Sequence, residues 1–375
     1  MFFRYYQTII DQYLKPNKVL VLYGPRQVGK TTLIRNFLAS YEGKVYRSTG
    51  DDTRLRELLE KPSITSLETY FSAYDLVFID EAQRIDNIGL ALKLMVDHLE
   101  DIRIIATGSS SFDLSNKVGE PLVGRQYVLR LHPIALLELD EQFGWASVED
   151  HMENYLIYGL YPETVNLQGV QHKEDYLYQL RDGYLYKDIL ELESLRNPGK
   201  IMDLLRLIAF QIGKEVSIEE LGNQLGMSKN TVVRYLDLLE KVFVLIKVRG
   251  FSRNLRKEVT KSPRFYFYDN GVRNAVINNF QPLKNRNDVE QLWENFVFTE
   301  RLKKRTYHRI HANTYFWRTY QQKEIDLVEE REGGLFGYEF KYNPKSFKPP
   351  KDWLNAYPEA SLDVINRKNL KEFVT

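Results

Sequence analysis

The chain has 375 residues, of which 43% are hydrophobic and 27% are charged, which is enough apolar material for two or three packed domains. The formal net charge of +1 excludes a general affinity for polyanions, so a nucleic-acid surface has to come from local clusters of basic residues. The absence of cysteine excludes disulfides and thiolate metal sites and fits a reducing compartment. The first residues lack the basic and apolar stretches of a secretory signal, and no window reaches the ~20 apolar residues that cross a bilayer. We therefore expect a cytoplasmic protein with no membrane partner.

Short apolar runs alternate with helix-length segments over the first third of the chain, after an amphipathic opening helix. Such runs are typical of buried parallel strands. The alternation predicts an α/β fold with a parallel sheet wound on both faces and closing near residue 135. The predicted strands are 18–23, 44–47, 76–79, 102–106 and 127–131.

The rest of the chain changes character twice. A helical pattern rich in tyrosine and leucine follows the sheet and is broken at Gly159–Pro162. Three helices and a β-hairpin come next, and then a mixed segment with alternating strands. We expect a domain built on the parallel sheet at 1–135, a helical lid or linker at 136–200, a third domain at 201–285 and a fourth at 286–375.

A phosphate-binding loop follows the first predicted strand, because residues 24–31 read G-P-R-Q-V-G-K-T. Its backbone N–H groups are expected to face phosphate oxygens, with Lys30 on the β- and γ-phosphates and the Thr31 hydroxyl on magnesium. The helix after Gly29 adds the positive end of its dipole. A glycine-rich turn without function is the weaker interpretation, because the loop comes directly after a buried strand. The predicted nucleotide-binding residues are Gly24, Pro25, Arg26, Gln27, Val28, Gly29, Lys30, Thr31 and Thr32.

Two acids, Asp80 and Glu81, end the predicted strand 76–79. Asp80 is expected to hold magnesium, and Glu81 to polarise the attacking water as a general base. Alone, the pair fits a solvated turn equally well. Its position after the loop, behind an intervening strand and helix, favours the catalytic interpretation and hence ATP and Mg²⁺ as ligands.

Two further positions are candidates for catalysis. Ser109 lies in the hydroxyl-rich segment 107–111 and has the chemistry to meet the γ-phosphate or the water, although the capped start of a helix explains these residues equally well. Arg125 precedes the last strand and is predicted to reach the nucleotide of a neighbouring subunit, against the alternative of a surface arginine. That role requires a homo-oligomer, for which a hexameric ring is one arrangement.

Together these residues resemble the AAA superfamily of P-loop ATPases. In particular, the chain is similar to a bacterial and archaeal family that joins an AAA-like ATPase module to a C-terminal module of uncharacterised function. The resemblance implies binding of ATP with Mg²⁺ and leaves the biological role open. The matching stretches are 24–31, 76–83, 107–111, 124–125, 159–162, 186–189, 324–328 and 338–342.

The third predicted domain carries a candidate DNA interface. Three helices followed by a two-stranded ribbon predict a winged helix, whose third helix, 228–241, would enter the major groove. We expect Val232, Val233, Leu236 and Leu239 to face inward, and the opposite face and the ribbon loop to contact duplex DNA. A protein-contact module is the alternative interpretation. The predicted DNA-binding residues are Asn230, Arg234, Lys241, Arg253, Arg256 and Lys257.

The fourth predicted domain resembles the PD-(D/E)xK nuclease fold, without the proline that precedes the first acid of that motif. Glu339 and Lys341 alternate onto one side of a strand. Asp326 and Glu339 are expected to share a magnesium, with Glu294 near the metal and Lys341 assisting the water. An ordinary hairpin with solvated acids, or a module kept for binding without cleavage, are the alternatives.

Two functions of different classes follow from these predictions. The first is an ATP-hydrolysing AAA-type protein that acts on DNA through a winged helix and a nuclease-like domain. The alternative is a nucleotide-dependent switch that binds a protein partner without nucleic-acid chemistry.

Overall fold

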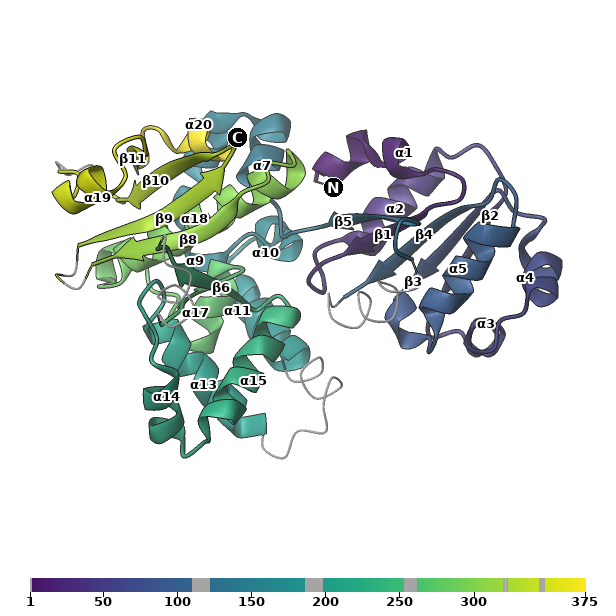
Figure 1. Cartoon of the computed structure of the whole chain (residues 1–375), viewed down its shortest axis with the longest axis horizontal. Helices are drawn as coiled ribbons and strands as arrows, with labels where there is room; N and C mark the ends of the chain where they lie inside the picture. The colour runs from purple at the N-terminus through teal and green to yellow at the C-terminus, as the bar shows by residue number, and fades with distance from the viewer. Residues whose placement is uncertain are drawn as a thin grey trace. The chain divides into compact units, whose positions relative to one another are not determined.

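The computed structural model of the chain describes residues 2–109, 122–185, 198–252, 262–319, 321, 323–343 and 348–375 (Figure 1). The chain divides into two compact units, Met1–Ile134 and Ala135–Thr375. Several predicted features lie outside the described residues: Arg253, Arg256, Lys257 and the stretch 186–189. No helix among the described residues is long and apolar enough to cross a membrane.

The first unit is built on a five-stranded sheet in which all neighbouring strands are parallel. The strand order is β2-β3-β4-β1-β5, so β4 lies between β1 and β3. The predicted α/β class and parallel sheet are confirmed. The strands are β1 (Val19–Tyr23), β2 (Val45–Thr49), β3 (Leu76–Asp80), β4 (Arg103–Gly108) and β5 (Gln126–Arg130).

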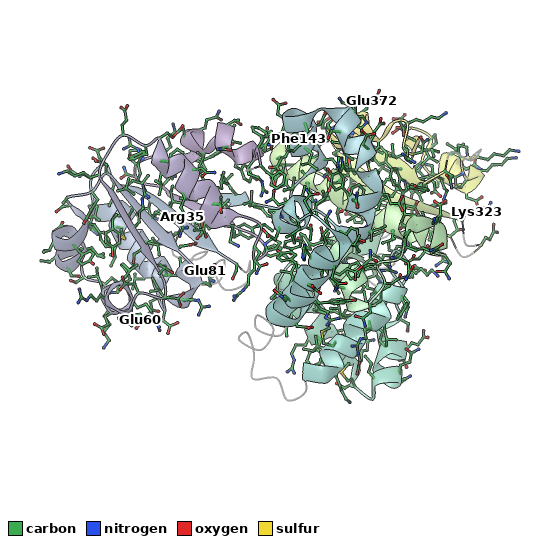
Figure 2. All side chains as sticks on the ribbon, turned by 180° about the vertical axis from the view of Figure 1, so that it is seen from behind. Arg35, Glu60, Glu81, Phe143, Lys323 and Glu372 are labelled. Carbon is green, nitrogen blue, oxygen red and sulfur yellow. The ribbon has the colours of Figure 1, made fainter. Side chains whose placement is uncertain are left out.

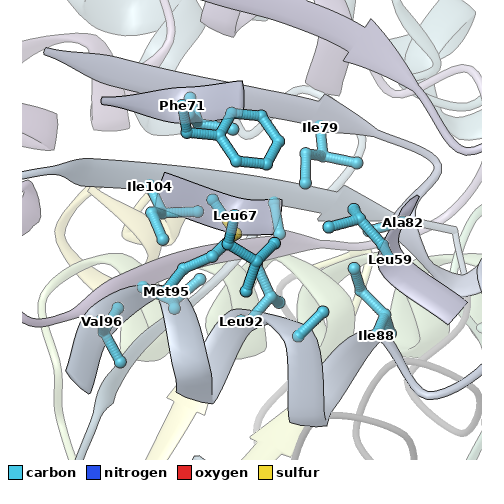
Figure 3. Packing of buried hydrophobic residues seen from close by; sticks show 14 of the residues in the cluster. Leu59, Leu67, Phe71, Ile79, Ala82, Ile88, Leu92, Met95, Val96 and Ile104 are labelled. Atoms are coloured by element: carbon cyan, nitrogen blue, oxygen red, sulfur yellow. The ribbon is translucent and has the colours of Figure 1, made fainter. Parts of the chain in front are cut away.

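Helices cover both faces of this sheet, with α2 on one face and α5 on the other (Figure 1). Figure 3 shows the core on the α5 side, where Ile79 and Ile104 from the strands pack against Leu92 and Met95. Burial of each such side chain stabilises the folded state by roughly 1.5–3 kcal/mol. This packing holds in place the strands whose carboxyl ends carry the candidate site. The helices are η1 (Tyr5–Thr8), α1 (Ile10–Tyr13), α2 (Lys30–Ala39), α3 (Thr53–Glu60), α4 (Ile64–Phe71), η2 (Ala82–Arg84) and α5 (Ile88–His98).

The second unit opens with a group of helices, and its predicted break at Gly159 has a structural cause. Gly159 has φ 72°, and a Cβ there would lie 1.9 Å from the Asp269 carboxylate. That carboxylate accepts a 2.7 Å hydrogen bond from Leu160 N and caps α17 (Asn270–Val276). The helices of this group are α7 (Leu136–Phe143), α8 (Trp145–Asp150), α9 (Met152–Tyr158), α10 (Pro162–Asn166), α11 (Val170–Leu180) and η3 (Arg181–Leu185).

A three-helix group follows: α13 (Pro198–Phe210), α14 (Ile218–Leu225) and α15 (Lys229–Lys241). The hydroxyls of Ser217 and Ser228 accept backbone hydrogen bonds at the starts of α14 and α15, which satisfies donors that a helix leaves unpaired. The chain then forms the antiparallel pair β6 (Leu245–Gly250) and β7 (Arg264–Phe267).

The C-terminal strands continue that pair into one mixed sheet of order β11-β10-β9-β8-β6-β7. The junction is a short parallel contact, Arg249 opposite Tyr315 and Gly250 opposite Phe316. One sheet thus contains strands from both sides of residue 285. The remaining elements are η4 (Leu283–Asn285), α18 (Val289–Tyr307), β8 (Asn313–Arg318), β9 (Glu324–Arg331), β10 (Gly334–Phe340), α19 (Lys351–Ala356), β11 (Ser361–Ile365) and α20 (Leu370–Val374).

Candidate nucleotide site and acidic cluster

The predicted phosphate loop connects β1 to α2, and two of its glycines are required by geometry. A Cβ on Gly24 would lie 2.0 Å from the Leu131 carbonyl oxygen, so the backbones approach too closely for a side chain. Gly29 has φ 92°, a conformation that L side chains rarely adopt, and it is the N-cap of α2. The Lys30 ammonium is 5% exposed and donates to the carbonyls of Gly24 (2.9 Å) and Pro25 (2.8 Å). The lysine therefore lies across the loop.

The carboxyl ends of β1, β3 and β4 bring three polar side chains together at one edge of the sheet. The Thr31 hydroxyl donates to Asp80 Oδ2 at 2.8 Å, and the Thr107 hydroxyl donates to Asp80 Oδ1. Hydroxyl and carboxylate oxygens are ligands that Mg²⁺ accepts, and in phosphate sites water and phosphate oxygens complete its shell. The donor set of Thr31 and Asp80 therefore fits the ion.

Glu81 has φ 49°, in the left-handed region, which costs a residue with a side chain about 1–2 kcal/mol. Figure 2 labels this side chain in the first unit. The Gln83 amide donates to Glu81 Oε2 at 2.6 Å and to Ser109 Oγ at 3.1 Å. Gln83 is 8% exposed, so this bridge is sheltered from water.

Sequence reasoning gave Gln83 no role, although it lies in the matching stretch 76–83. Its position two residues after Glu81 was the available signal. The structure also brings Ser109, 3% exposed, into the group around Glu81. The rest of the hydroxyl-rich segment, residues 110 and 111, lies outside the described residues.

Arg125 lies at the amino end of β5, where its backbone carbonyl accepts from Val19 N at the start of β1. Because the strands are parallel, this is the edge of the sheet opposite the phosphate loop. The guanidinium contacts Asp97 Oδ1 of α5 at 2.6 Å. Within one chain Arg125 therefore does not join the other predicted catalytic residues, and its role towards a neighbouring subunit stays a prediction.

The predicted DNA-binding residues of α15 lie on its outer side: Asn230 and Arg234 are exposed, and Lys241 is partly buried. Val232, Leu236 and Leu239 are buried as predicted, but Val233 is 36% exposed, so the prediction that it faces inward is wrong. It comes three residues after Asn230, and this spacing puts it on the same face of the helix.

The second unit brings the four predicted acidic-cluster residues together from α18, β9 and β10. Tyr338 is opposite Leu327 in the antiparallel register, so Glu339 is opposite Asp326 and both point to one face of the sheet. Lys341 Nζ lies 2.6 Å from Glu339 Oε1. Phe340 N donates to Asp326 Oδ2 at 2.9 Å.

Arg264, which sequence reasoning did not single out, enters this cluster from β7. Its guanidinium is 2% exposed and lies 3.8 Å from both Asp326 Oδ1 and Glu294 Oε1. It also contacts Glu324 at 2.6 Å, and the Tyr266 hydroxyl donates to Glu294 at 2.7 Å. Arg264 lies on β7, far in sequence from Asp326, Glu339 and Lys341. The spacing of those three residues therefore could not predict that it joins them.

Burial governs the protonation of these acids. Burial, followed by the charge of Asp326, raises the pKa of Glu339 to about 7. Burial also raises the pKa values of Glu294 and Asp326. Four acids, Glu294, Asp326, Glu339 and Glu324, face two cations here, Arg264 and Lys341. This excess of acids favours a bound proton in the cluster near neutral pH.

The guanidinium of Arg264 is the cation that Glu294 and Asp326 share. Both Asp326 oxygens face protein donors, whereas Glu339 Oε2 is buried with no hydrogen-bond partner among the described residues. No group of three His, Cys, Asp or Glu side chains in the described ranges is arranged to hold a metal. Asp326 and Glu339 converge as predicted, and the magnesium ion that they were expected to share stays a prediction.

Comparisons with known proteins divide the chain in three. Residues 16–139 match the family model described as an AAA domain, and residues 149–283 and 289–373 match two domains of unknown function, DUF8612 and DUF4143. An uncharacterised protein of Mycobacterium tuberculosis is 29% identical over 333 residues, 86% of this chain and 70% of its own. An uncharacterised protein of Methanocaldococcus jannaschii is 23% identical, over 96% of this chain and 83% of its own.

Among solved structures, a Walker-type ATPase of Pyrococcus abyssi has 16% sequence identity and a TM-score of 0.47. The match covers 73% of this chain and 94% of that chain. The AAA-domain match contains the phosphate loop, Asp80, Glu81 and the whole parallel sheet. The first unit of this protein therefore has the fold of an AAA-type P-loop ATPase.

Proposed function

We propose that this protein binds ATP with Mg²⁺, hydrolyses it, and uses the reaction to act on DNA through its second unit. The observation that carries the ATPase part is the joining of phosphate loop and acidic strand end by the Thr31–Asp80 hydrogen bond. A glycine-rich turn without function has no need for a hydroxyl and a carboxylate at this position.

Each residue then has a defined task. Lys30 exchanges its loop carbonyl partners for the β- and γ-phosphate oxygens, while loop N–H groups hold the remaining charge. Thr31 and Asp80 hold the magnesium ion, which supplies Lewis acidity to the γ-phosphate when it is bound. Glu81 takes a proton from water as the water oxygen attacks phosphorus and the bond to the ADP oxygen breaks. In a homo-oligomer such as a hexameric ring, Arg125 of a neighbouring subunit stabilises the negative charge that develops on the γ-phosphate in the transition state.

The DNA part rests on the elements of residues 201–285. Three helices followed by an antiparallel pair are the elements of a winged helix, and Asn230 and Arg234 lie exposed on the third helix. The acidic cluster supports a nuclease-like module that binds without cleaving, because the buried Arg264 already lies beside Glu294 and Asp326 as their cation.

One observation favours the second candidate function, a nucleotide-dependent switch that binds a protein. Val233 is exposed on the same face of α15 as Asn230. An apolar residue within a polar face is more typical of a contact with protein than with phosphates.

The experiment measures ATP turnover with duplex, branched and single-stranded DNA at two salt concentrations, with Lys30→Ala as the inactive control. A DNA-acting ATPase is stimulated by one of these DNAs, and its affinity for that DNA falls as salt rises. Turnover that no DNA changes would favour the protein-partner switch. Equal ATP affinity in wild type and folded Lys30→Ala would overturn the nucleotide site itself.

A further inference from the structure

A buried arginine near the start of the chain holds the outside of the phosphate loop. Arg4 precedes η1 and is 6% exposed. Its Nη1 donates to the Val28 carbonyl at 2.6 Å, and its Nη2 donates to the His132 carbonyl at 2.6 Å. One guanidinium therefore joins three segments that are far apart in sequence.

The contact with Val28 bears directly on phosphate binding. A loop that turns its N–H groups inward to phosphate turns carbonyls outward, and a buried carbonyl needs a donor from the protein. Val28 is fully buried, and Arg4 supplies that donor. Arg4 Nη1 is also the nearest atom to the position of a Cβ on Gly29, at 3.6 Å. Its positive charge therefore lies close to Gly29, the N-cap of α2.

The segment Leu131–His132 contacts both ends of the same loop. At the start, Leu131 N donates to the Tyr23 carbonyl at 2.8 Å and the Leu131 carbonyl closes on Gly24. At the end, His132 is joined to Val28 through Arg4. The first unit ends only two residues later, at Ile134, and the chain continues into the second unit.

We infer that Arg4 is a positioning residue that couples nucleotide occupancy of the phosphate loop to the segment 131–134 leading to the second unit. The inference rests on the proposed ATP binding. When phosphate oxygens order the loop N–H groups, the Val28 carbonyl is fixed in direction. The planar guanidinium transmits that order to the His132 carbonyl, because its two donors are rigidly linked.

Two variants distinguish the contribution of the positive charge of Arg4 from that of its two hydrogen bonds, which Nη1 and Nη2 donate. Arg4→Lys keeps a cation but lacks two donors in a fixed geometry, and Arg4→Met removes the charge and both hydrogen bonds while keeping an apolar stem. The control is Arg56→Lys on α3, a partly buried side chain that pairs with Glu60 at 3.5 Å.

The experiment is amide hydrogen exchange with and without Mg-AMP-PNP, a non-hydrolysable ATP analogue, together with its binding affinity. In wild type and Arg56→Lys the analogue slows exchange in peptides covering 24–33 and 129–136. In Arg4→Lys, affinity falls about tenfold, the cost of a lost buried hydrogen bond to a charged group. Protection over 24–33 remains in this variant, and protection over 129–136 is lost. Arg4→Met loses more affinity than Arg4→Lys.

The outcomes distinguish the two proposals. Wild-type protein that binds the analogue without slowing exchange over 129–136 would overturn the coupling alone. So would an Arg4→Lys variant with wild-type protection in both peptides. Wild-type protein that does not bind the analogue would overturn the proposed ATPase and, with it, the coupling. Thermal unfolding of each variant identifies any that is not folded, and Arg4→Lys, the smaller change, then decides.

Discussion

The hydroxyl of Thr31 donates a 2.8 Å hydrogen bond to the carboxylate of Asp80, tying the first turn of α2 to the end of β3. Strand β4 separates β3 from the loop-bearing strand β1. The hydrogen bond thus crosses a neighbouring strand, and Thr107 at the end of β4 donates to the same carboxylate. Asp80 is therefore held from two sides by hydroxyl groups.

Glu81→Gln should leave ATP binding intact and lower kcat by ~10² or more, because an amide accepts no proton from water. Single-turnover kinetics and a separate ATP titration measure the two quantities. Glu60→Gln, a change at the end of α3, is the matched control. Unchanged kcat in Glu81→Gln would assign the general base to another group.

Gln83→Leu should lower kcat by roughly tenfold with KM nearly unchanged, since the 2.6 Å bond that orients Glu81 is removed without touching the phosphate loop. The combination of Gln83→Leu with Glu81→Gln should be no slower than Glu81→Gln alone, because the two residues act as one unit. A double variant whose losses multiply would separate Gln83 from Glu81.

Arg264→Met should destabilise the second unit by about 3–5 kcal/mol, because it leaves Glu294 and Asp326 without their buried cation. Arg206→Met, which breaks an exposed pair with Asp203, should cost less than about 1 kcal/mol. Urea unfolding measures both. Equal losses would show that Arg264 contributes little to holding the acids together.

The pH dependence of stability tests the protonation of Glu339. Its folded pKa of about 7 lies above the value of 4.5 for a glutamate in the unfolded chain, so the folded state holds the proton more tightly. The corresponding stability is fully present below about pH 4.5 and is lost as pH rises through 7, by up to roughly 3 kcal/mol. Glu339→Gln cannot titrate. We expect its unfolding free energy to change less than that of wild type between pH 5 and pH 8, and parallel curves for the two proteins would contradict the assignment.

Replacing Arg234 and Lys241 with alanine should weaken DNA binding uniformly across sequences and reduce its salt slope, because two phosphate-facing cations are lost. Val233→Ala, on the same helix, is the control for a DNA interface and should change little. If Val233→Ala lowers the affinity for a protein partner, and the alanine variants of Arg234 and Lys241 bind DNA as tightly as wild type, α15 is a protein-binding surface.

Local patterns carried most of what could be predicted. The short apolar runs within Val19–Tyr23 and Leu76–Asp80 were predicted as buried strands from their length and composition, and the phosphate loop is a local backbone motif. Arg4 and Arg264 could not be predicted, because each acts on residues more than a strand or helix away in sequence. Val233 shows the limit of helical periodicity, since it adjoins the buried Val232 and the exposed Arg234 at the border between the two faces of the helix.

The parallel contact between β6 and β8 has a practical consequence for fragments of this protein. A polypeptide that stops at residue 285 would leave Arg249 and Gly250 of β6 without their partners, and the complementary piece would present β8 as an uncovered edge. Unpaired edges recruit strands from other chains. Fragments cut at this point should therefore self-associate, and soluble expression calls for the whole of Ala135–Thr375 as one piece.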